Sequence, residues 1–350
     1  MSGKIEGIQV ARALAAIGVM LSHSALIVNA IPDSKKIIIP FIYSYGGMGV
    51  QLFFVISGFI IAKVLDAKRD DTRSFFIKRI FRIYPAYWLV TFAAIYLHQT
   101  WQISFHRIYP HPDFILKSLT LWPIPAAPFF QVGWTLEHEI IFYLIAGLLV
   151  PLAGLYAVMV AFTVLGVAGM IGVAFIPGFW GYNVVSEMNL YFAAGMAIYV
   201  FQNSLEKIHW GAAALGSVVV LVLYVALRPY TAGSTFVLFQ VPSLIIVFLL
   251  LCVSLMNMPA QKGVIWRILV WCGNISYSLY LTHWIVYRVI RQWQSQPFIA
   301  DNPELLRWAG IAASFLLAWV MYKFVEQPSI SIGHYLAAKA RTDKREAALP

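Results

Sequence analysis

Apolar residues in this chain gather into ten long segments, each separated from the next by a shorter polar stretch. A helix needs about 20 apolar residues to cross the hydrocarbon core of a bilayer. We therefore predict about ten transmembrane helices, at residues 6–28, 46–65, 80–98, 132–150, 155–176, 187–202, 211–227, 237–256, 268–290 and 305–325. The sixth and seventh segments are the shortest. An even number of spans places both termini on one side of the membrane.

The distribution of basic residues indicates which side that is. One group lies in Asp66–Arg82, between the second and third spans, and another lies near the end of the chain: Lys68, Arg69, Arg73, Lys78, Arg79 and Arg82, then Lys339, Arg341, Lys344 and Arg345. Loops rich in Lys and Arg stay in the cytoplasm, so we expect both termini to be cytoplasmic. We expect residues 1–330 to form a single membrane domain and residues 331–350 a basic cytoplasmic tail.

The composition agrees with an all-α, polytopic membrane helix bundle. Of the 350 residues, 61% are hydrophobic and only 11% are charged, and the mean hydropathy is +0.76. The net charge of +10 does not indicate nucleic acid, because the basic residues lie between apolar segments rather than on one soluble face. Cys252 and Cys272 lie in or beside apolar segments and have no disulfide or metal-ligand spacing. No metal site is expected.

The first span is interrupted by two polar residues, Arg12 and His23. Eleven positions of an α-helix bring His23 to within roughly 20° of Arg12, about 16 Å further along the axis. A cation deep in a spanning helix costs about 2.5 to 3.5 kcal/mol, so Arg12 should face protein, a cavity or a ligand. Alternatively, Arg12 reaches the cytoplasmic interface and His23 is a hydrogen-bonded residue of the bundle interior. We favour a functional role for the pair.

A second pair of cations lies where the third span begins. Arg79 and Arg82 are three residues apart and therefore share one face of a helix, beside Tyr84 and Trp88. Basic and aromatic residues together are an ordinary cytoplasmic anchor. Guanidinium groups at the interface also bind phosphate well, through paired hydrogen bonds. Both readings are open on this evidence.

The fourth span begins with two acidic residues, Glu137 and Glu139. Carboxylates in the first turn of a helix interact favourably with its dipole, and this explains Glu137 without a function. Glu139 lies deeper in the apolar segment and should have a partner. On the expected topology the fourth span starts at the outer side, and His23 lies in the outer half of the first span. Glu139 and His23 are therefore expected to meet.

The glycines of the second span are explained by packing. Gly46, Gly47, Gly49 and Gly58 allow close approach between helices at the second span.

The long connection at residues 99–131, rich in Pro, Trp and His, is expected to form an outer lid or binding wall. His283 is expected to be buried with a hydrogen bond, and Glu326 to form an ion pair at the inner end of the last span.

Taken together, these segments resemble the acyltransferase-3 family of integral-membrane acyltransferases. The matching pieces are Arg12 and His23 with ten residues between them, LFFVISGFII (52–61), FFIKRIFRIYPAYW (75–88), GWTLEHEIIFY (133–143), ISYSLYLTHW (275–284) and FVEQP (324–328). Each piece alone is a weak signal, whereas all of them in this order across ten spans are specific. The residues around Glu137 and His138 differ from the family's usual sequence in this segment, so the family's glutamate is assigned to Glu139 by spacing.

The resemblance implies transfer of an acyl group, usually acetyl from cytosolic acetyl-CoA, to a hydroxyl of a cell-surface or secreted glycan or a lipid-linked saccharide. It implies a multi-pass protein of the bacterial inner membrane, in contact with lipid, with no tightly bound cofactor and no nucleic-acid partner. His23 and Glu139 match the family's catalytic positions, and Arg12, Arg79 and Arg82 its donor-binding positions. Many relatives carry an additional extracytoplasmic domain, which this chain is expected to lack.

Resemblance and geometry together suggest that His23 is the general base, that Glu139 orients it, and that the arm of acyl-CoA extends along the stripe from Arg12 to His23. A covalent acyl-histidine is the open variant, since one ring nitrogen can serve as base or nucleophile. The alternative from another class is a transporter or flippase, in which the same polar residues line a path. Such proteins often contain internal repeats, and none is evident.

Overall fold

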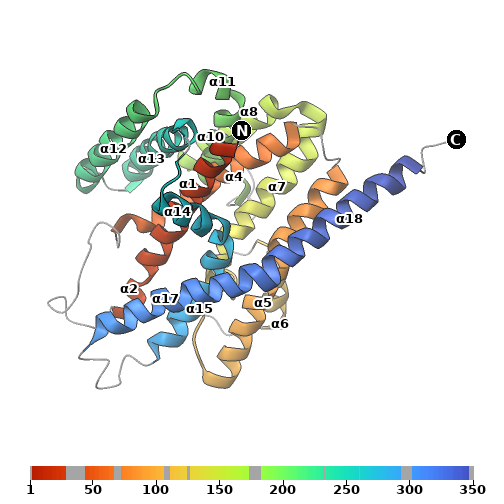
Figure 1. Cartoon of the computed structure of the whole chain (residues 1–350), viewed down its shortest axis with the longest axis vertical. Coiled ribbons are helices and arrows are strands. Elements are labelled where there is room, and N and C mark those ends of the chain that lie inside the picture. Colours follow the sequence, from red (N-terminus) through yellow and green to blue (C-terminus); the bar gives the residue numbers. More distant parts are fainter. Residues whose placement is uncertain are drawn as a thin grey trace. The chain divides into compact units, whose positions relative to one another are not determined.

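The computed structural model describes residues 2–28, 44–66, 72–105, 111–123, 127–172, 183–231, 233–259, 261–292 and 302–346. Every regular element in these ranges is helical, and they contain no β-strand (Figure 1). Lipid offers no partners for backbone N–H and C=O groups, and a helix satisfies these groups internally. The predicted all-α, polytopic membrane protein is confirmed.

Packing divides the chain into two compact units. The first contains Met1–Leu14, Gln51–Thr72 and His138–Asn274, and the second contains Ala15–Val50, Arg73–Glu137 and Ile275–Pro350. Four of the five boundaries between the units fall within long helices, α1 (Ser2–His23), α4 (Gly49–Asp66), α5 (Thr72–Trp101) and α7 (Trp134–Ala153), and the fifth follows Asn274. Arg12 and Glu139 therefore belong to the first unit, and His23, Arg79 and Arg82 to the second.

Seven helices of the described residues are long and apolar enough to cross a membrane: Glu6–Ile27, Gly46–Asp66, Thr72–Trp101, Gln131–Ala153, Trp210–Tyr230, Phe236–Asn257 and Glu304–Asp343. Each overlaps a predicted span. Two further predicted spans correspond to shorter apolar helices, α8 (Leu155–Met170) and α10 (Met188–Val200). The predicted span 268–290 is divided at Ile275, where α14 (Val264–Asn274) gives way to α15 (Ser276–Arg291). The count of ten crossings and the side of the termini stay predictions.

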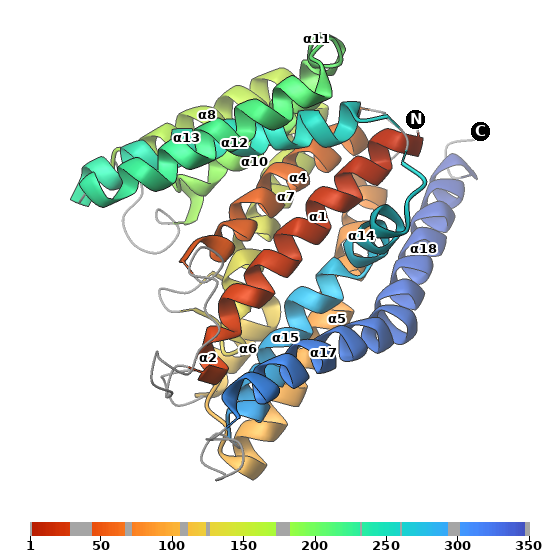
Figure 2. The same ribbon diagram turned by 60° about the vertical axis from the view of Figure 1, so that its left-hand side comes forward.

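In the first unit, α12 (Trp210–Leu227) packs along α13 (Gly233–Asn257), and α10 contacts both α8 and α13 (Figure 2). The backbones of α4 and α10 touch at two glycines. A Cβ atom on Gly58 would lie 2.1 Å from the carbonyl oxygen of Phe192, and one on Gly195 would lie 1.9 Å from that of Val55. Only glycine fits such contacts, so the predicted packing role of Gly58 is confirmed.

In the second unit, α15 packs along α17 (Pro303–Met321), and the short helix α2 (Ala25–Val28) contacts both. The chain continues from α17 through a π-helical turn, Tyr322–Glu326, into α18 (Gln327–Glu346). One-turn π-helices frequently occur at functional positions in a longer helix. Here the turn ends at Glu326, whose side chain is buried.

Helix α18 lies along α5 (Thr72–Trp101) in the second unit (Figure 1). The Ser74 hydroxyl donates a hydrogen bond to the carbonyl of Ala337 over 3.1 Å. A Cβ on Gly333 would lie 2.6 Å from the Cβ of Phe81. Much of the segment expected as a basic tail therefore forms a helix that packs on the third predicted span.

The beginning of α4 also lies against α1 in the second unit. A Cβ on Gly49 would lie 2.3 Å from the carbonyl oxygen of Ala15, and one on Gly46 would lie 2.3 Å from that of Gly18. Gly47 differs, because the nearest atom to its Cβ would be the Ser22 hydroxyl oxygen, 3.9 Å away. The prediction of close packing is confirmed for Gly46 and Gly49, whereas Gly47 has room for a side chain.

The connection after α5 folds back onto α5. Its helix α6 (Pro112–Thr120) ends beside the middle of α5, where the hydroxyl of Tyr84 donates to the carbonyl of Thr120 over 2.9 Å. The Tyr87 hydroxyl and the Trp88 indole N–H donate, each over 2.8 Å, to the carbonyls of the two residues before Thr120. Carbonyls at a helix end lack partners within the helix, and these donors satisfy them. Tyr84 and Trp88, expected as interface anchors, thus hold this connection.

Candidate functional site

His23 is the last residue of α1 and lies against α15 in the second unit. Its Nδ1 is 2.9 Å from Nε2 of His283. The two imidazole rings lie side by side in nearly one plane, with centroids 5.2 Å apart and planes 12° from parallel. The indole of Trp284 meets the His23 ring edge-on, with a centroid distance of 5.2 Å. Position and plane of the His23 ring are therefore set by two neighbouring residues of α15.

His283 is fully buried and forms a second contact within its own helix. Its Nδ1 is 3.0 Å from the carbonyl oxygen of Leu279, one turn earlier. The rings of Tyr280 and Tyr287 flank the imidazole, at centroid distances of 5.9 and 5.7 Å. The expectation that His283 is buried with a hydrogen bond is confirmed. Sequence reasoning missed its partner, because nothing in the residue pattern links two positions 260 residues apart.

Glu139 lies in the first unit, and its Oε1 accepts hydrogen bonds from two hydroxyls. One comes from Ser57 over 2.7 Å, and the other comes from Tyr143, one turn further along α7. The prediction that this carboxylate has partners is met by these hydroxyls. The predicted contact with His23 stays a prediction, since His23 belongs to the second unit. Arg12 is half-buried in the first unit, where its Nη1 is 3.4 Å from the Gln9 side-chain oxygen.

The two cations of α5 differ in their surroundings within the second unit. Arg82 Nη1 is 2.7 Å from Oε1 of Glu326, a carboxylate whose side chain has no exposed surface. The other carboxylate oxygen accepts a hydrogen bond of 2.5 Å from the Ser278 hydroxyl. The Arg79 guanidinium lies over the ring of Phe75, 5.7 Å from its centroid. An ion pair was expected at Glu326, but its partner on α5 was missed.

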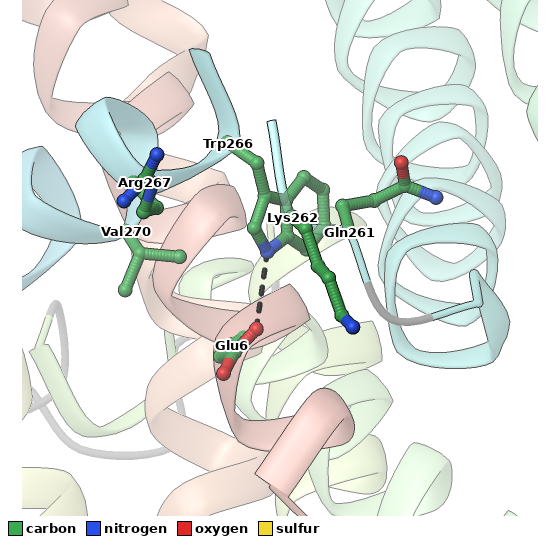
Figure 3. Close-up of a pocket in the computed structure, with 6 residues that line it drawn as sticks. All are labelled: Glu6, Gln261, Lys262, Trp266, Arg267 and Val270. Carbon is green, nitrogen blue, oxygen red and sulfur yellow. Dashed lines mark hydrogen bonds between the residues drawn. The ribbon is translucent and has the colours of Figure 1, made fainter. Parts of the chain in front are cut away.

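A pocket of about 480 Å³ opens in the first unit, between the start of α1 and α14 (Figure 3). Its floor contains the Trp266 indole, whose N–H donates to Oε2 of Glu6 over 3.1 Å. The exposed side chains of Lys262 and Arg267 lie on its wall. This pocket was not predicted from the sequence. Across the described ranges, no group of three or more His, Cys, Asp or Glu side chains is arranged to hold a metal ion.

Apolar helices that contain a contact between His23 and the buried His283, an ion pair between Arg82 and the buried Glu326, and a hydrogen-bonded glutamate are typical of a multi-pass membrane protein with polar groups inside it. The comparisons with known proteins identify which kind. Residues 5–323 match the acyltransferase domain of the acyltransferase-3 family. The chain belongs to this family, and the predicted resemblance is confirmed.

Three similar proteins have names that refer to acetyl transfer or to exopolysaccharide production. ExoZ, an exopolysaccharide production protein of Rhizobium meliloti (strain 1021), is 27% identical over 317 residues, which cover 83% of this chain and 92% of ExoZ. ORF330 of Acidianus two-tailed virus, provisionally named an acetyltransferase, is 26% identical, covering 71% and 76% of the two chains. YrhL of Bacillus subtilis (strain 168), provisionally named a peptidoglycan O-acetyltransferase, is 25% identical, covering 81% of this chain and 50% of YrhL. No solved structure is significantly similar.

Proposed function

We propose that this membrane acyltransferase moves an acetyl or other short acyl group from cytosolic acyl-CoA to a hydroxyl of a cell-surface or secreted glycan, or of its lipid-linked precursor. The family supports acyl transfer, and the names of ExoZ and YrhL support a saccharide acceptor. We place the protein in the bacterial inner membrane as a multi-pass enzyme, with acyl-CoA as a substrate rather than a resident cofactor.

The observation that carries the proposal is the placement of His23. Its Nδ1 is engaged by His283, and Nε2 is then the nitrogen available for chemistry. In the proposed step His23 Nε2 takes the proton of the acceptor hydroxyl while that oxygen attacks the thioester carbonyl. The carbon–sulfur bond breaks, and the CoA thiolate takes the proton back from His23. The products are an ester and free CoA, and His23 returns to its starting state.

Donor binding is assigned to the cations of the predicted cytoplasmic side. Arg79 and Arg82 share one face of α5 and are proposed to contact the phosphates of acyl-CoA. Arg82 is held by Glu326, which fixes the position of its guanidinium. Arg12 is proposed as a further donor-binding cation, on the stripe of α1 that ends at His23. Glu139 remains the proposed second catalytic residue.

The test is release of free CoA from acetyl-CoA by purified protein in vesicles, with and without glycan extract. Wild type is compared with His23→Ala and with His98→Ala, a control histidine of α5 whose Nδ1 lies 3.0 Å from the carbonyl oxygen of Ile103. We expect glycan-dependent release that is lost in His23→Ala and retained in His98→Ala. Normal release by His23→Ala would contradict the role of the base. Solute flux without CoA release would contradict the enzyme and support a transporter.

A further inference from the structure

The two contacts of His283 determine where its proton lies. A backbone carbonyl oxygen can only accept a hydrogen bond, so the 3.0 Å contact to Leu279 requires a hydrogen on Nδ1 of His283. A neutral imidazole carries one hydrogen, and complete burial disfavours a charge here. Nε2 of His283 therefore presents a lone pair, and this is the atom that faces His23.

The proton position in His23 follows from the same reasoning. Because Nε2 of His283 accepts, Nδ1 of His23 must donate across the 2.9 Å that separate them. A neutral His23 then has no hydrogen on Nε2. We propose that His283 is a positioning residue, which holds His23 as the Nδ1–H tautomer and so leaves Nε2 free to act as base. This inference rests on the proposed function for its catalytic consequence but not for the tautomer itself.

The contact with His283 also stabilises the His23 imidazolium that forms during the proposed reaction. When Nε2 of His23 takes the proton of the acceptor hydroxyl, the ring becomes an imidazolium and still donates through Nδ1 to His283. A hydrogen bond from a charged donor is stronger than a neutral one, so the contact stabilises the intermediate state. The in-line contact with His283 and the edge-on Trp284 ring oppose rotation of the imidazole. A carboxylate plays the equivalent part in other histidine-dependent acyl transfers.

The first experiment measures the tautomer directly. Protein labelled with ¹⁵N-histidine in lipid vesicles is examined by solid-state NMR, and the His23 signals, among those of eight histidines, are assigned from their loss in His23→Gln. We expect wild type to carry the His23 hydrogen on Nδ1, hydrogen-bonded to a second imidazole. A His23 hydrogen on Nε2 would overturn the proposal. This measurement needs no activity, so it decides the inference even if no CoA release is detected and the proposed function fails.

The second experiment compares three variants in the CoA-release assay. His283→Leu removes the acceptor, His283→Gln restores one through its side-chain oxygen, and His98→Leu is the matched histidine control. We expect kcat to fall about 10- to 100-fold in His283→Leu, with the apparent KM for acetyl-CoA changed less than about twofold. His283→Gln should lie within about fivefold of wild type, and His98→Leu should be unchanged.

Each result of this comparison has a defined meaning. A folded His283→Leu protein with wild-type kcat would overturn the proposal, as would a His283→Gln variant no better than His283→Leu. Folding is checked by size-exclusion chromatography. If His283→Leu does not fold, activity retained by His283→Gln supports the proposal and activity lost there overturns it, with the wild-type tautomer as the independent measurement.

Discussion

Variants of the ion pair between Arg82 and Glu326 can show whether Arg82 has a structural role or binds a ligand. Glu326 has no exposed side-chain surface and has two donors, the Arg82 guanidinium and the Ser278 hydroxyl. Arg82 is about a quarter exposed. Arg82→Ala therefore leaves a buried carboxylate with the neutral Ser278 hydroxyl as its donor, whereas Glu326→Gln leaves a cation that is partly exposed. The two single substitutions should differ in their cost.

Removing one partner of a buried ion pair typically costs about 3 to 5 kcal/mol, because the other charge stays buried without compensation. We expect Arg82→Ala to fall in this range. Glu326→Gln keeps a hydrogen-bonding side chain of the same size and should cost about 1 to 3 kcal/mol. The double variant Arg82→Ala/Glu326→Gln has no buried charge at this position, so it should be more stable than Arg82→Ala alone.

Stability is measured as unfolding in detergent, by the loss of helical circular dichroism with temperature and by titration with a denaturing detergent. The control is Arg73→Ala, which removes an exposed cation of the same helix. Equal unfolding of Arg82→Ala and the double variant would refute the assignment of the loss to a buried charge. An unfolding temperature lower in the double variant than in Arg82→Ala would refute it as well.

The same variants test donor binding. If Arg82 contacts the phosphates of acyl-CoA, the apparent KM for acetyl-CoA should be raised in Arg82→Ala and should stay raised in the double variant, although its stability recovers. We expect this result from the proposed function. Recovery of both stability and KM in the double variant would mean that Arg82 acts only through Glu326, and it would remove Arg82 from the donor site.

Further predictions concern donor binding, packing and the glutamate. Arg79→Ala should raise the apparent KM for acetyl-CoA about tenfold while Lys262→Ala leaves it unchanged; the opposite ranking would move donor binding to the pocket beside α14. Gly49→Ala should destabilise the protein by about 1 to 3 kcal/mol, because its Cβ meets a backbone carbonyl, and Gly47→Ala should be tolerated; thermal unfolding that ranks them equally would contradict the packing. Glu139→Gln should lower kcat about tenfold at unchanged KM, and wild-type kcat would remove Glu139 from the catalytic residues.

The fold was predictable because the bilayer allows so few alternatives. A long apolar segment must form a helix in lipid, so hydropathy alone located the seven long helices. The division at Ile275 was not predicted, since the apolar run continues through it and only the flanking Asn274 and Ser276 weaken the helix. The return of α6 to α5 was also missed, because it depends on side-chain donors that find carbonyls some 30 residues away.

The candidate site residues were easier to recognise in the sequence than their partners. A charged or imidazole side chain in an apolar helix stands out by its cost, and this identified Arg12, His23 and Glu139. Periodicity then gives the face of one helix, but it does not give the rotation of a neighbouring helix. His283 was expected to be buried with a hydrogen bond and Glu326 to form an ion pair. Their partners, His23 and Arg82, were missed, since these contacts exist only in the tertiary structure.

Helix α15 explains why those two contacts belong together. Ser278 binds the carboxylate that holds Arg82, and His283 binds His23, five residues or about 7.5 Å further along the same helix. Between them Tyr280 donates to the carbonyl of Val132, in the turn that precedes α7. These polar residues make α15 less apolar than the candidate membrane-spanning helices. Each of them contacts a different segment of the second unit. A rigid helix thus fixes the spacing between the proposed donor-binding cation and the proposed base.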